Sequence, residues 1–232
     1  MSDGLGARPT LRVASYNTRD LLDDAAAAAR VVRALDPDVL CLQEVPRRLL
    51  AARRVARFAT ACGLRWAGAH RGSGGVTIFT SDRVEVSESS HHRLPVRLGV
   101  RRRGYAVATV ALPGHPPLTV VSLHLSLVAA QRVQHVNQLL AEIGADAAPV
   151  RTIVAGDLNE EPGSAAYALL ARHLVAVGEP ALTFPTSNPD KALDVVFASA
   201  DLVARPGSPV ALDEADLRAA TDHLPVWVEV QS

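Results

Sequence analysis

Polar and acidic side chains recur at or near the ends of apolar, strand-like segments of this sequence. The residues that share this position are Asn17, Glu44, His124, Asp157, Asn159, Asp194, Asp222 and His223. A carboxylate at the edge of an apolar run is costly unless it is paired or bound to a metal ion. Hard cations such as Mg²⁺ prefer carboxylate and amide oxygens, and α/β folds place their ligand sites at strand ends. The set is therefore a candidate site for a ligand or a metal ion.

Each of these side chains, taken singly, also has a simpler structural role. Turn or cap positions would suit Asn17, Asn159, Asp157 and Asp222. Glu44 could accept a hydrogen bond at the start of a following helix, Asp194 could pair with an arginine, and His124 could be a buried core histidine. Only the ordered set, and no single residue, separates a chemical role from these structural ones.

The elements that must position these residues can be predicted from periodicity and turn signals. Strands are predicted at residues 10–17, 38–42, 65–69, 75–80, 84–89, 105–112, 118–125, 150–155, 192–198 and 226–230. Helices are predicted at residues 23–35, 46–62, 129–143 and 164–171. The first third alternates strand and helix, whereas the middle holds successive strands separated by Gly- and Pro-rich turns. This pattern predicts an α/β fold with antiparallel hairpins.

The 232 residues show no linker, repeat or low-complexity segment that would divide the chain, apart from a run of alanines that favours helix. We expect a short N-terminal tail, residues 1–9, followed by a single domain at residues 10–232. No run approaches the ~20 apolar residues of a membrane span, and the N-terminus lacks the pattern of a secretory signal. The expected location is therefore the cytoplasm.

The charge balance limits the kind of partner that the chain can hold. Basic and acidic residues number 24 each. Tight, non-specific binding of duplex nucleic acid normally requires a basic excess, because affinity comes largely from neutralised phosphates. The equal numbers therefore weigh against a protein that binds duplex nucleic acid tightly and without specificity. They are compatible with one local basic patch. Cys41 and Cys62 provide neither a disulfide framework nor metal-ligand spacing, and no protein partner is indicated.

Short motifs around the candidate residues resemble the endonuclease/exonuclease/phosphatase superfamily, which includes deoxyribonuclease I. They follow the family's order along nearly the whole chain. The motifs are Ser15-Tyr16-Asn17, Leu42-Gln43-Glu44-Val45, Ser122-Leu123-His124-Leu125, Gly156-Asp157-Leu158-Asn159, Leu193-Asp194-Val195-Val196-Phe197 and Thr221-Asp222-His223-Leu224-Pro225-Val226. The resemblance implies an α/β four-layer sandwich of two mixed, mostly antiparallel β-sheets flanked by helices. It also implies a metal-dependent phosphoester hydrolase.

The same resemblance implies a metal site with Mg²⁺ as the cofactor and Mn²⁺ as its substitute. Glu44 is the first expected metal ligand, with Asn17 and Asp222 assisting. Asp157 and Asn159 are expected to position or activate the nucleophile and to hold the phosphate, or to hold a second metal ion.

The remaining roles concern protons and phosphate oxygens. The resemblance implies that His223 is the general base or a phosphate contact, oriented by Asp194, and that His124 contacts the phosphate or acts as an acid. Arg19 and Arg103 are candidate phosphate ligands. The Arg-rich segment that ends at Arg103 has an equally good explanation as a solvated loop.

The substrate class stays open within the hydrolase interpretation. A phosphodiester is the favoured substrate, with nucleic acid as one candidate and a nuclease or phosphodiesterase as the expected enzyme. The alternatives are a phosphomonoesterase acting on a phosphorylated small molecule or lipid, and a non-catalytic binding domain that kept the fold. The complete acidic set argues against the non-catalytic domain, and its order along the chain argues against chance matches in an unrelated α/β protein.

Overall fold

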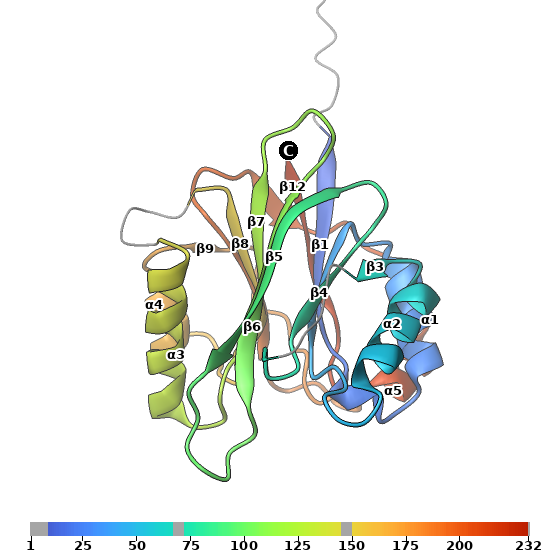
Figure 1. The fold of residues 1–232 in the computed structure, drawn as a ribbon, viewed down its shortest axis with the longest axis horizontal. Helices are drawn as coiled ribbons and strands as arrows, with labels where there is room; N and C mark the ends of the chain where they lie inside the picture. Colours follow the sequence, from blue (N-terminus) through green and yellow to red (C-terminus); the bar gives the residue numbers. More distant parts are fainter. Residues whose placement is uncertain (1–8, 67–71, 145–149, 232) are drawn as a thin grey trace, which may run out of the picture.

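The computed structural model describes residues 9–66, 72–144 and 150–231. Two six-stranded sheets face each other in the middle of the molecule (Figure 1). The first contains, in spatial order, β11 (Ala204–Pro206), β12 (Val226–Gln231), β1 (Thr10–Asn17), β2 (Val39–Gln43), β4 (Thr77–Thr80) and β3 (Arg65–Trp66). The second contains β5 (Glu85–Leu94), β6 (Arg103–Ala111), β7 (Leu118–His124), β8 (Thr152–Asp157), β10 (Asp194–Ala198) and β9 (Val175–Ala176).

Helices cover the outer face of each sheet (Figure 1). The first sheet carries α1 (Ala25–Leu35), α2 (Ala51–Cys62) and α5 (Glu214–Ala220), and the second carries α3 (Ala129–Glu142) and α4 (Ala165–Leu170). Each sheet has one parallel pair, β1 with β2 and β7 with β8, and its other pairs are antiparallel. The predicted four-layer sandwich of mixed, mostly antiparallel sheets is confirmed.

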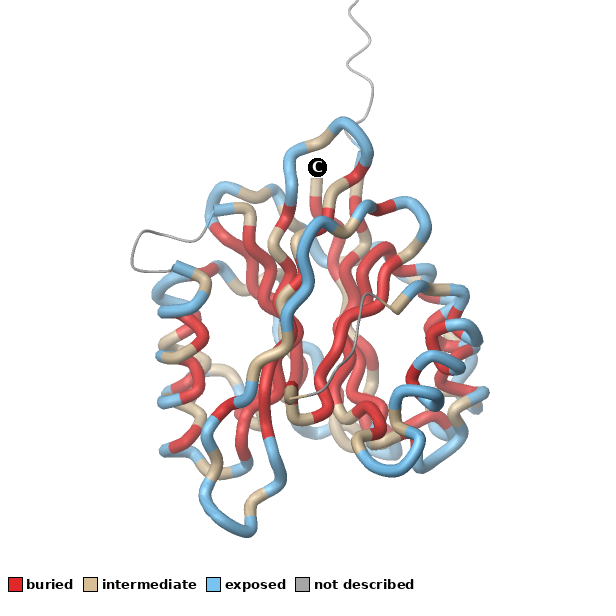
Figure 2. Tube along the Cα trace, in the orientation of Figure 1, coloured by how far each residue is buried: buried red, intermediate tan, exposed pale blue. Residues whose placement is uncertain are grey.

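Three apolar layers hold the sandwich together, and Figure 2 shows the buried positions concentrated along the strands and on the inward faces of the helices. The layer between the sheets includes Val13 and Val120, both fully buried. The layer under α1 and α2 includes Tyr16 and Leu35, and the layer under α3 and α4 includes Leu139. Removing this apolar surface from water is the main favourable term in folding.

The two parallel pairs arise because a helix crosses over between their strands. α1 connects β1 to β2, and α3 lies between β7 and β8 in the chain. The side chain of Asp24 begins α1 by accepting hydrogen bonds from the backbone N–H groups of Ala26 and Ala27. Gly156 lets β7 and β8 approach, because a Cβ at that position would lie 1.9 Å from the Leu123 carbonyl oxygen. The close approach fixes the strand that carries the next residue, Asp157.

The predicted helix at residues 46–62 is wrong at its start, since α2 begins at Ala51. The backbone N–H of Val45 donates to Gly75 O at 2.9 Å, which holds this segment against the start of β4. Leu50 then takes a left-handed conformation, with φ 58°, immediately before the helix. Residues 46–50 therefore form a loop, and the loop carries Arg47 toward the end of β2.

Other predicted boundaries also shift, and the end of β5 moves as far as the start of α2. β5 continues to Leu94, so the first part of the Arg-rich segment is strand and only residues 95–102 form a loop. Of the strand predicted at residues 65–69, the structure describes Arg65–Trp66, and residues 67–69 lie outside the described part. The short elements α5, β9 and β11, and the 3-10 turn η1 (Arg19–Leu21), were not predicted from the sequence.

Residues 1–8 of the predicted N-terminal tail lie outside the described residues, and the division into a tail and a single domain stays a prediction. Among the described residues, none of the helices is long and apolar enough to cross a membrane. The cytoplasmic location stays a prediction.

Candidate active site

The predicted site residues converge at one edge of the sandwich, where both parallel pairs end. Asn17 ends β1 and His124 ends β7. Asp157, at the end of β8, stands opposite both His124 and Asp194, because antiparallel β10 begins where β8 ends. β1 and β2 contact β7 and β8 across the sandwich, so the two parallel pairs bring their carboxyl ends together at this edge. Glu44 follows β2 at the same edge, with φ 52°, a left-handed conformation that turns the chain out of the strand.

The last motif reaches the same edge through a loop between α5 and β12. Thr221 Oγ1 donates to the Asn17 carbonyl at 3.0 Å, which attaches the loop to the end of β1. The backbone N–H of Leu224 donates to Thr183 O at 2.8 Å on the other side. The two intervening residues, Asp222 and His223, are thereby held beside the strand ends.

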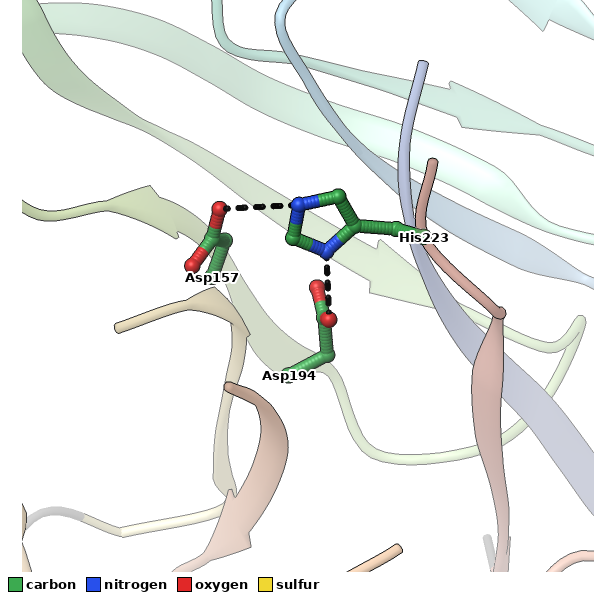
Figure 3. Close-up of side chains that lie close together, drawn as sticks. All are labelled: Asp157, Asp194 and His223. Carbon is green, nitrogen blue, oxygen red and sulfur yellow. Dashed lines mark hydrogen bonds and ion pairs between the residues drawn. The ribbon is translucent and has the colours of Figure 1, made fainter. Parts of the chain in front are cut away.

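Asp157, Asp194 and His223 form a compact, buried group (Figure 3). His223 Nδ1 lies 2.8 Å from Asp194 Oδ2, and His223 Nε2 faces Asp157 Oδ2 at 3.8 Å. Thr183 Oγ1 donates to the same Asp194 oxygen at 2.6 Å. The imidazole ring also contacts the ring of Phe184, with centroids 4.9 Å apart. Asp194 therefore orients His223, so that one imidazole nitrogen is bound and the other points at Asp157.

Asp157 accepts a hydrogen bond on each of its two carboxylate oxygens. Asn17 Nδ2 donates to Asp157 Oδ2 at 2.9 Å, and the backbone N–H of Asn159 donates to Asp157 Oδ1 at 2.8 Å. Asn159 has a left-handed backbone, φ 50°, and its side-chain amide donates to Leu125 O at 3.0 Å. The tight turn after β8 thus fixes both residues of the Asp157–Asn159 motif.

The burial of this group shifts its protonation equilibria. Burial, reinforced by the negative charge of Asp194, raises the pKa of Asp157 to about 7. Burial alone would lower the pKa of His223, but the Asp194 carboxylate outweighs it and the pKa of His223 rises to about 9. Near neutral pH His223 is therefore an imidazolium, whereas Asp157 is close to the midpoint of its titration.

His124 is electrostatically the opposite of His223. It is almost completely buried, and this burial, together with the nearby Arg103 cation, holds its pKa well below the usual range. Its Nε2 atom makes no hydrogen bond and lies 3.4 Å from Asp157 Oδ2 and 3.9 Å from Glu44 Oε1. His124 is thus a neutral imidazole with one nitrogen facing the centre of the site.

Glu44 is a partly buried carboxylate that could bind a metal ion. Its side chain is 13% exposed, and Oε2 lies 2.8 Å from Arg101 Nη1. Arg101 lies in the loop between β5 and β6 and also pairs with Asp20. The site holds several carboxylate oxygens and the Asn17 amide within a partly dry edge, and such donors fit a hard divalent cation. Binding of a cation at Glu44 would compete with the guanidinium of Arg101.

A second group of metal-compatible atoms is already engaged in hydrogen bonds. Asp157, Asp194 and His223 each offer an atom within 4.8 Å of the others. However, the imidazole of His223 is bound through Nδ1 to Asp194, and a protonated imidazole has no lone pair for a metal ion. The geometry of this group therefore suits proton transfer better than metal binding, whereas Glu44 is held by an ion pair with Arg101 that a cation could replace.

The two predicted phosphate ligands occupy different environments. Arg103 is buried, and its Nε donates to Leu125 O at 2.7 Å. Burial lowers the pKa of Arg103, although a guanidinium stays charged at neutral pH. Arg19 is about half exposed and lies 3.4 Å from Asp222 Oδ2. Both arginines lie at the edge, and their contact with a phosphate stays a prediction, as do the catalytic and metal-binding roles of the other site residues.

Sequence reasoning missed a buried polar connection beneath the site. Gln43 Nε2 donates at 3.1 Å to Ser15 Oγ in its own sheet and at 3.1 Å to Ser122 Oγ in the opposite sheet. It also missed Arg101 as the partner of Glu44 and Thr183 as the partner of Asp194. A glutamine directly after the apolar run at residues 39–42 was the available signal for the first of these, because a buried amide requires partners.

The chain was compared with protein families and known proteins. The sequence profile of the Endonuclease/Exonuclease/phosphatase family matches residues 14–223. A search of curated proteins finds no match. A functionally unknown conserved protein from Enterococcus faecalis V583 has a similar structure, with TM-score 0.78 and 19% sequence identity over 95% of this chain and 99% of that one.

Two further similar structures have named activities. ANGEL2, a 2′,3′-cyclic phosphatase in complex with adenosine-2′,3′-vanadate, has TM-score 0.74 and 17% identity over 98% of this chain and 99% of its own. The mannosyl-6-phosphatase Bt3783 of Bacteroides thetaiotaomicron VPI-5482 has TM-score 0.74 and 17% identity over 95% of this chain and 99% of its own. At these identities the similarity establishes the fold, and the family follows from the match over residues 14–223. The chain belongs to the endonuclease/exonuclease/phosphatase family, whose members are phosphoester hydrolases that generally depend on a divalent metal ion.

Proposed function

We propose that this protein is a Mg²⁺-dependent phosphodiesterase, with Mn²⁺ as a substitute, that acts on a phosphodiester such as a nucleic acid end. The observation that carries the proposal is the relay of Asp194, His223 and Asp157 beside a releasable Glu44. Hydrolysis of a phosphoester requires an aligned water, positive charge on the phosphoryl oxygens and stabilisation of the leaving oxygen.

Glu44 would be the first metal ligand, with Asn17 and Asp222 completing the protein's share. Asn17 would use its Oδ1 atom, which accepts a hydrogen bond from the Arg19 backbone at 3.1 Å and has a second lone pair. When bound, the metal ion would supply Lewis-acid stabilisation of charge on the phosphoryl and leaving oxygens. The protein's own groups then have the remaining tasks of orientation and proton transfer.

Asp157 is the group best suited to accept the proton of the attacking water. A general base works best when its pKa lies near the working pH, and the pKa of Asp157 is raised to about 7. The hydrogen bonds from Asn17 and Asn159 fix the carboxylate in one orientation, which favours a single direction of attack. Transfer of the water proton to Asp157 leaves hydroxide character on the nucleophile without moving any other group.

The two histidines would hold the phosphoryl oxygens. His223, kept as an imidazolium by Asp194, can donate its Nε2–H, which lies 3.8 Å from Asp157 Oδ2, to a phosphoryl oxygen. Neutral His124 can donate from Nε2, which has no hydrogen-bond partner in the described structure. One charged and one neutral donor on the same group of oxygens would stabilise the charge that develops in the transition state.

A phosphomonoester is the second candidate substrate. It is supported by the structural similarity to a protein named mannosyl-6-phosphatase, whereas the similarity to a 2′,3′-cyclic phosphatase supports a diester. The same proton relay could serve either ester, because both reactions break a P–O bond with water as the nucleophile.

The test compares bis(4-nitrophenyl) phosphate, 4-nitrophenyl phosphate and plasmid DNA as substrates, with Mg²⁺ or Mn²⁺ against EDTA. We expect metal-dependent hydrolysis that Glu44→Ala and His223→Ala abolish without loss of folding, judged by circular dichroism and thermal unfolding. Glu88→Ala, which removes an exposed carboxylate on edge strand β5, is the matched control and should retain activity. Near wild-type turnover in either site variant would overturn the assignment, and turnover of the monoester alone would replace the diesterase by a monoesterase.

A further inference from the structure

A pocket lies beside the candidate active site, against the first turn of α2. It has a volume of about 610 Å³. Its side-chain lining is dominated by Arg47, Arg48, Arg53, Arg93, Arg102 and Trp66. Among the described residues that line it, none is acidic. A pocket lined by five arginines without an acid is built for an anion, because close like charges repel one another until a negative group enters.

The charges of these arginines are poorly compensated within the protein. In the described part of the chain, no salt bridge is formed by four of these arginines, namely Arg48, Arg53, Arg93 and Arg102. The Nε atom of Arg47 lies 3.9 Å from Asp20 Oδ1, and the negative charges of Asp20 and Glu44 act on Arg47. Burial, and next the positive charge of Arg101, lower the pKa of Arg47. The pocket therefore has free guanidinium groups available for charge-assisted hydrogen bonds to phosphate oxygens.

The backbone around the pocket adds to this preference. The residue before α2 is Leu50, whose side chain makes no capping hydrogen bond, and Ala51, Ala52 and Arg53 of the first helical turn line the pocket. The N–H groups of a first helical turn favour anions. Gly74 forms part of the opposite wall, where a Cβ would lie 2.5 Å from the backbone of Arg103. The pocket is thus shaped by the fold as well as by flexible side chains.

A short chain of contacts connects the pocket to the candidate metal ligand. Arg47 lines the pocket and lies beside Asp20. Asp20 pairs with Arg101, and Arg101 lies 2.8 Å from Glu44. Arg47 Nη1 also donates to the carbonyl oxygen of Arg102 at 3.5 Å. A ligand held at Glu44 and a second group held by the arginines would therefore be neighbours along one surface.

We propose that this pocket binds a second phosphate group of the substrate, so that the enzyme selects substrates with at least two phosphates. This inference rests on the proposed function and adds the substrate class. Trp66 provides an apolar wall for the organic part between the phosphates, and its Nε1–H is fixed by a hydrogen bond to Thr77 Oγ1 at 2.9 Å. The second phosphate can belong to a nucleic acid strand or to a small molecule with several phosphates.

The binding test uses inorganic tripolyphosphate as the probe and isothermal titration calorimetry in EDTA. The double variant Arg53→Gln/Arg93→Gln removes two exposed pocket charges that have no part in the proposed chemistry. Two lost charge-assisted contacts should weaken binding by about 10-fold or more. Arg57→Gln, which removes an exposed charge on the same helix outside the pocket lining, should bind as the wild type does. Equal affinity of the double variant and the wild type would overturn the proposal.

The kinetic test distinguishes the two sources of the second phosphate. One arm compares thymidylyl-thymidine with and without a 5′-phosphate, and the other compares a hexose bisphosphate with the matching monophosphate. We expect at least a ~10-fold higher kcat/KM for the substrate with two phosphates in one arm, and a similar loss of that preference in the double variant. Hydrolysis of bis(4-nitrophenyl) phosphate should be unchanged in the double variant.

Failure of this inference and failure of the proposed function give different results. If no substrate is hydrolysed with either metal ion but the double variant still binds tripolyphosphate more weakly, the proposed function fails and the anion pocket stands. If bis(4-nitrophenyl) phosphate is hydrolysed but neither arm shows a preference for two phosphates, the second-phosphate pocket is wrong. The second-phosphate pocket would also be contradicted if the double variant lost kcat/KM equally on substrates with one phosphate and with two.

Discussion

The substitution Asp157→Asn should stabilise the metal-free protein while abolishing its activity. Asp157 is buried beside a second carboxylate, and its pKa rises from an ordinary 3.8 to about 7. An acid whose folded-state pKa is raised favours folding in its protonated form. The protonated Asp157 therefore contributes to the unfolding free energy in full below the pKa of the unfolded state, near 4. That contribution is lost as the pH rises through 7. At pH 8 the wild-type protein therefore holds a buried, ionised carboxylate at a cost in stability, whereas an asparagine carries no charge.

The size of the effect follows from the shift and from the hydrogen bonds that asparagine changes. A rise in pKa from 3.8 to about 7 corresponds to about 4 kcal/mol of unfolding free energy. Asparagine can still accept the Asn159 backbone bond through its oxygen, but its amide N–H₂ would face the Asn17 donor, now 2.9 Å from Oδ2. That mismatch should cost ~1–2 kcal/mol. We expect a net gain of about 2 kcal/mol at pH 8, or roughly 4–8 °C in Tm.

The assay is thermal and urea unfolding of wild type and Asp157→Asn in EDTA at pH 8 and pH 5, with hydrolysis measured in parallel. The gain should shrink at pH 5, where Asp157 is largely protonated in the wild type. Asp201→Asn is the control, because Asp201 is an exposed carboxylate that accepts bonds from Ser199 and the Arg151 backbone and should give no gain. A variant that is less stable than wild type at pH 8, or equally stabilised at both pH values, would refute the reasoning.

Three further predictions concern the fold, the metal and the proton relay. Gly156→Ala should lower the unfolding free energy by at least ~3 kcal/mol in urea unfolding, because its Cβ would lie 1.9 Å from the Leu123 carbonyl oxygen. A variant as stable as the wild type would contradict the β7–β8 geometry. Arg101→Gln should tighten Mn²⁺ binding by about 3- to 10-fold in electron paramagnetic resonance titrations, because the competing guanidinium at Glu44 is removed. Weaker binding would show that Arg101 assists metal binding and does not compete with it. Asp194→Asn should reduce kcat by ~10²- to 10⁴-fold with little change in KM, because the imidazole of His223 loses its anionic partner. A kcat within a few-fold of wild type would exclude the role proposed for this pair.

The convergence of the site could be predicted from the sequence because it depends on strand ends. Asn17, His124 and Asp157 each close an apolar run, and two parallel pairs necessarily bring such ends to one edge. The ordered motifs also identified the fold, which no single periodicity could have done. The apolar alternation of consecutive segments does not reveal that β4 and β5, neighbours in the chain, belong to different sheets.

What escaped prediction depends on contacts between distant segments. Arg101 lies in a loop of alternating polar and apolar residues, and its pairing with Glu44 exists only because the loop between β5 and β6 folds toward the end of β2. Thr183 is eleven positions from Asp194 and bonds to it across a turn. The late start of α2 follows from the bond between Val45 and Gly75, a contact between two loops. Local sequence cannot encode such pairings because each requires the completed sandwich.

The amide of Gln43, bonded to a serine in each sheet, has a consequence for how the molecule can vary. The proposed metal side of the site belongs to one sheet, with Asn17 and Glu44, whereas the acid–base side belongs to the other, with Asp157. The candidate site therefore lies between the two sheets, and the relative position of the sheets sets the distance between its two sides. Apolar packing alone tolerates small sliding of one layer over another, but a directional bond across the mid-plane does not. We therefore expect that core substitutions can preserve stability and still lower activity, if they change the position of one sheet relative to the other.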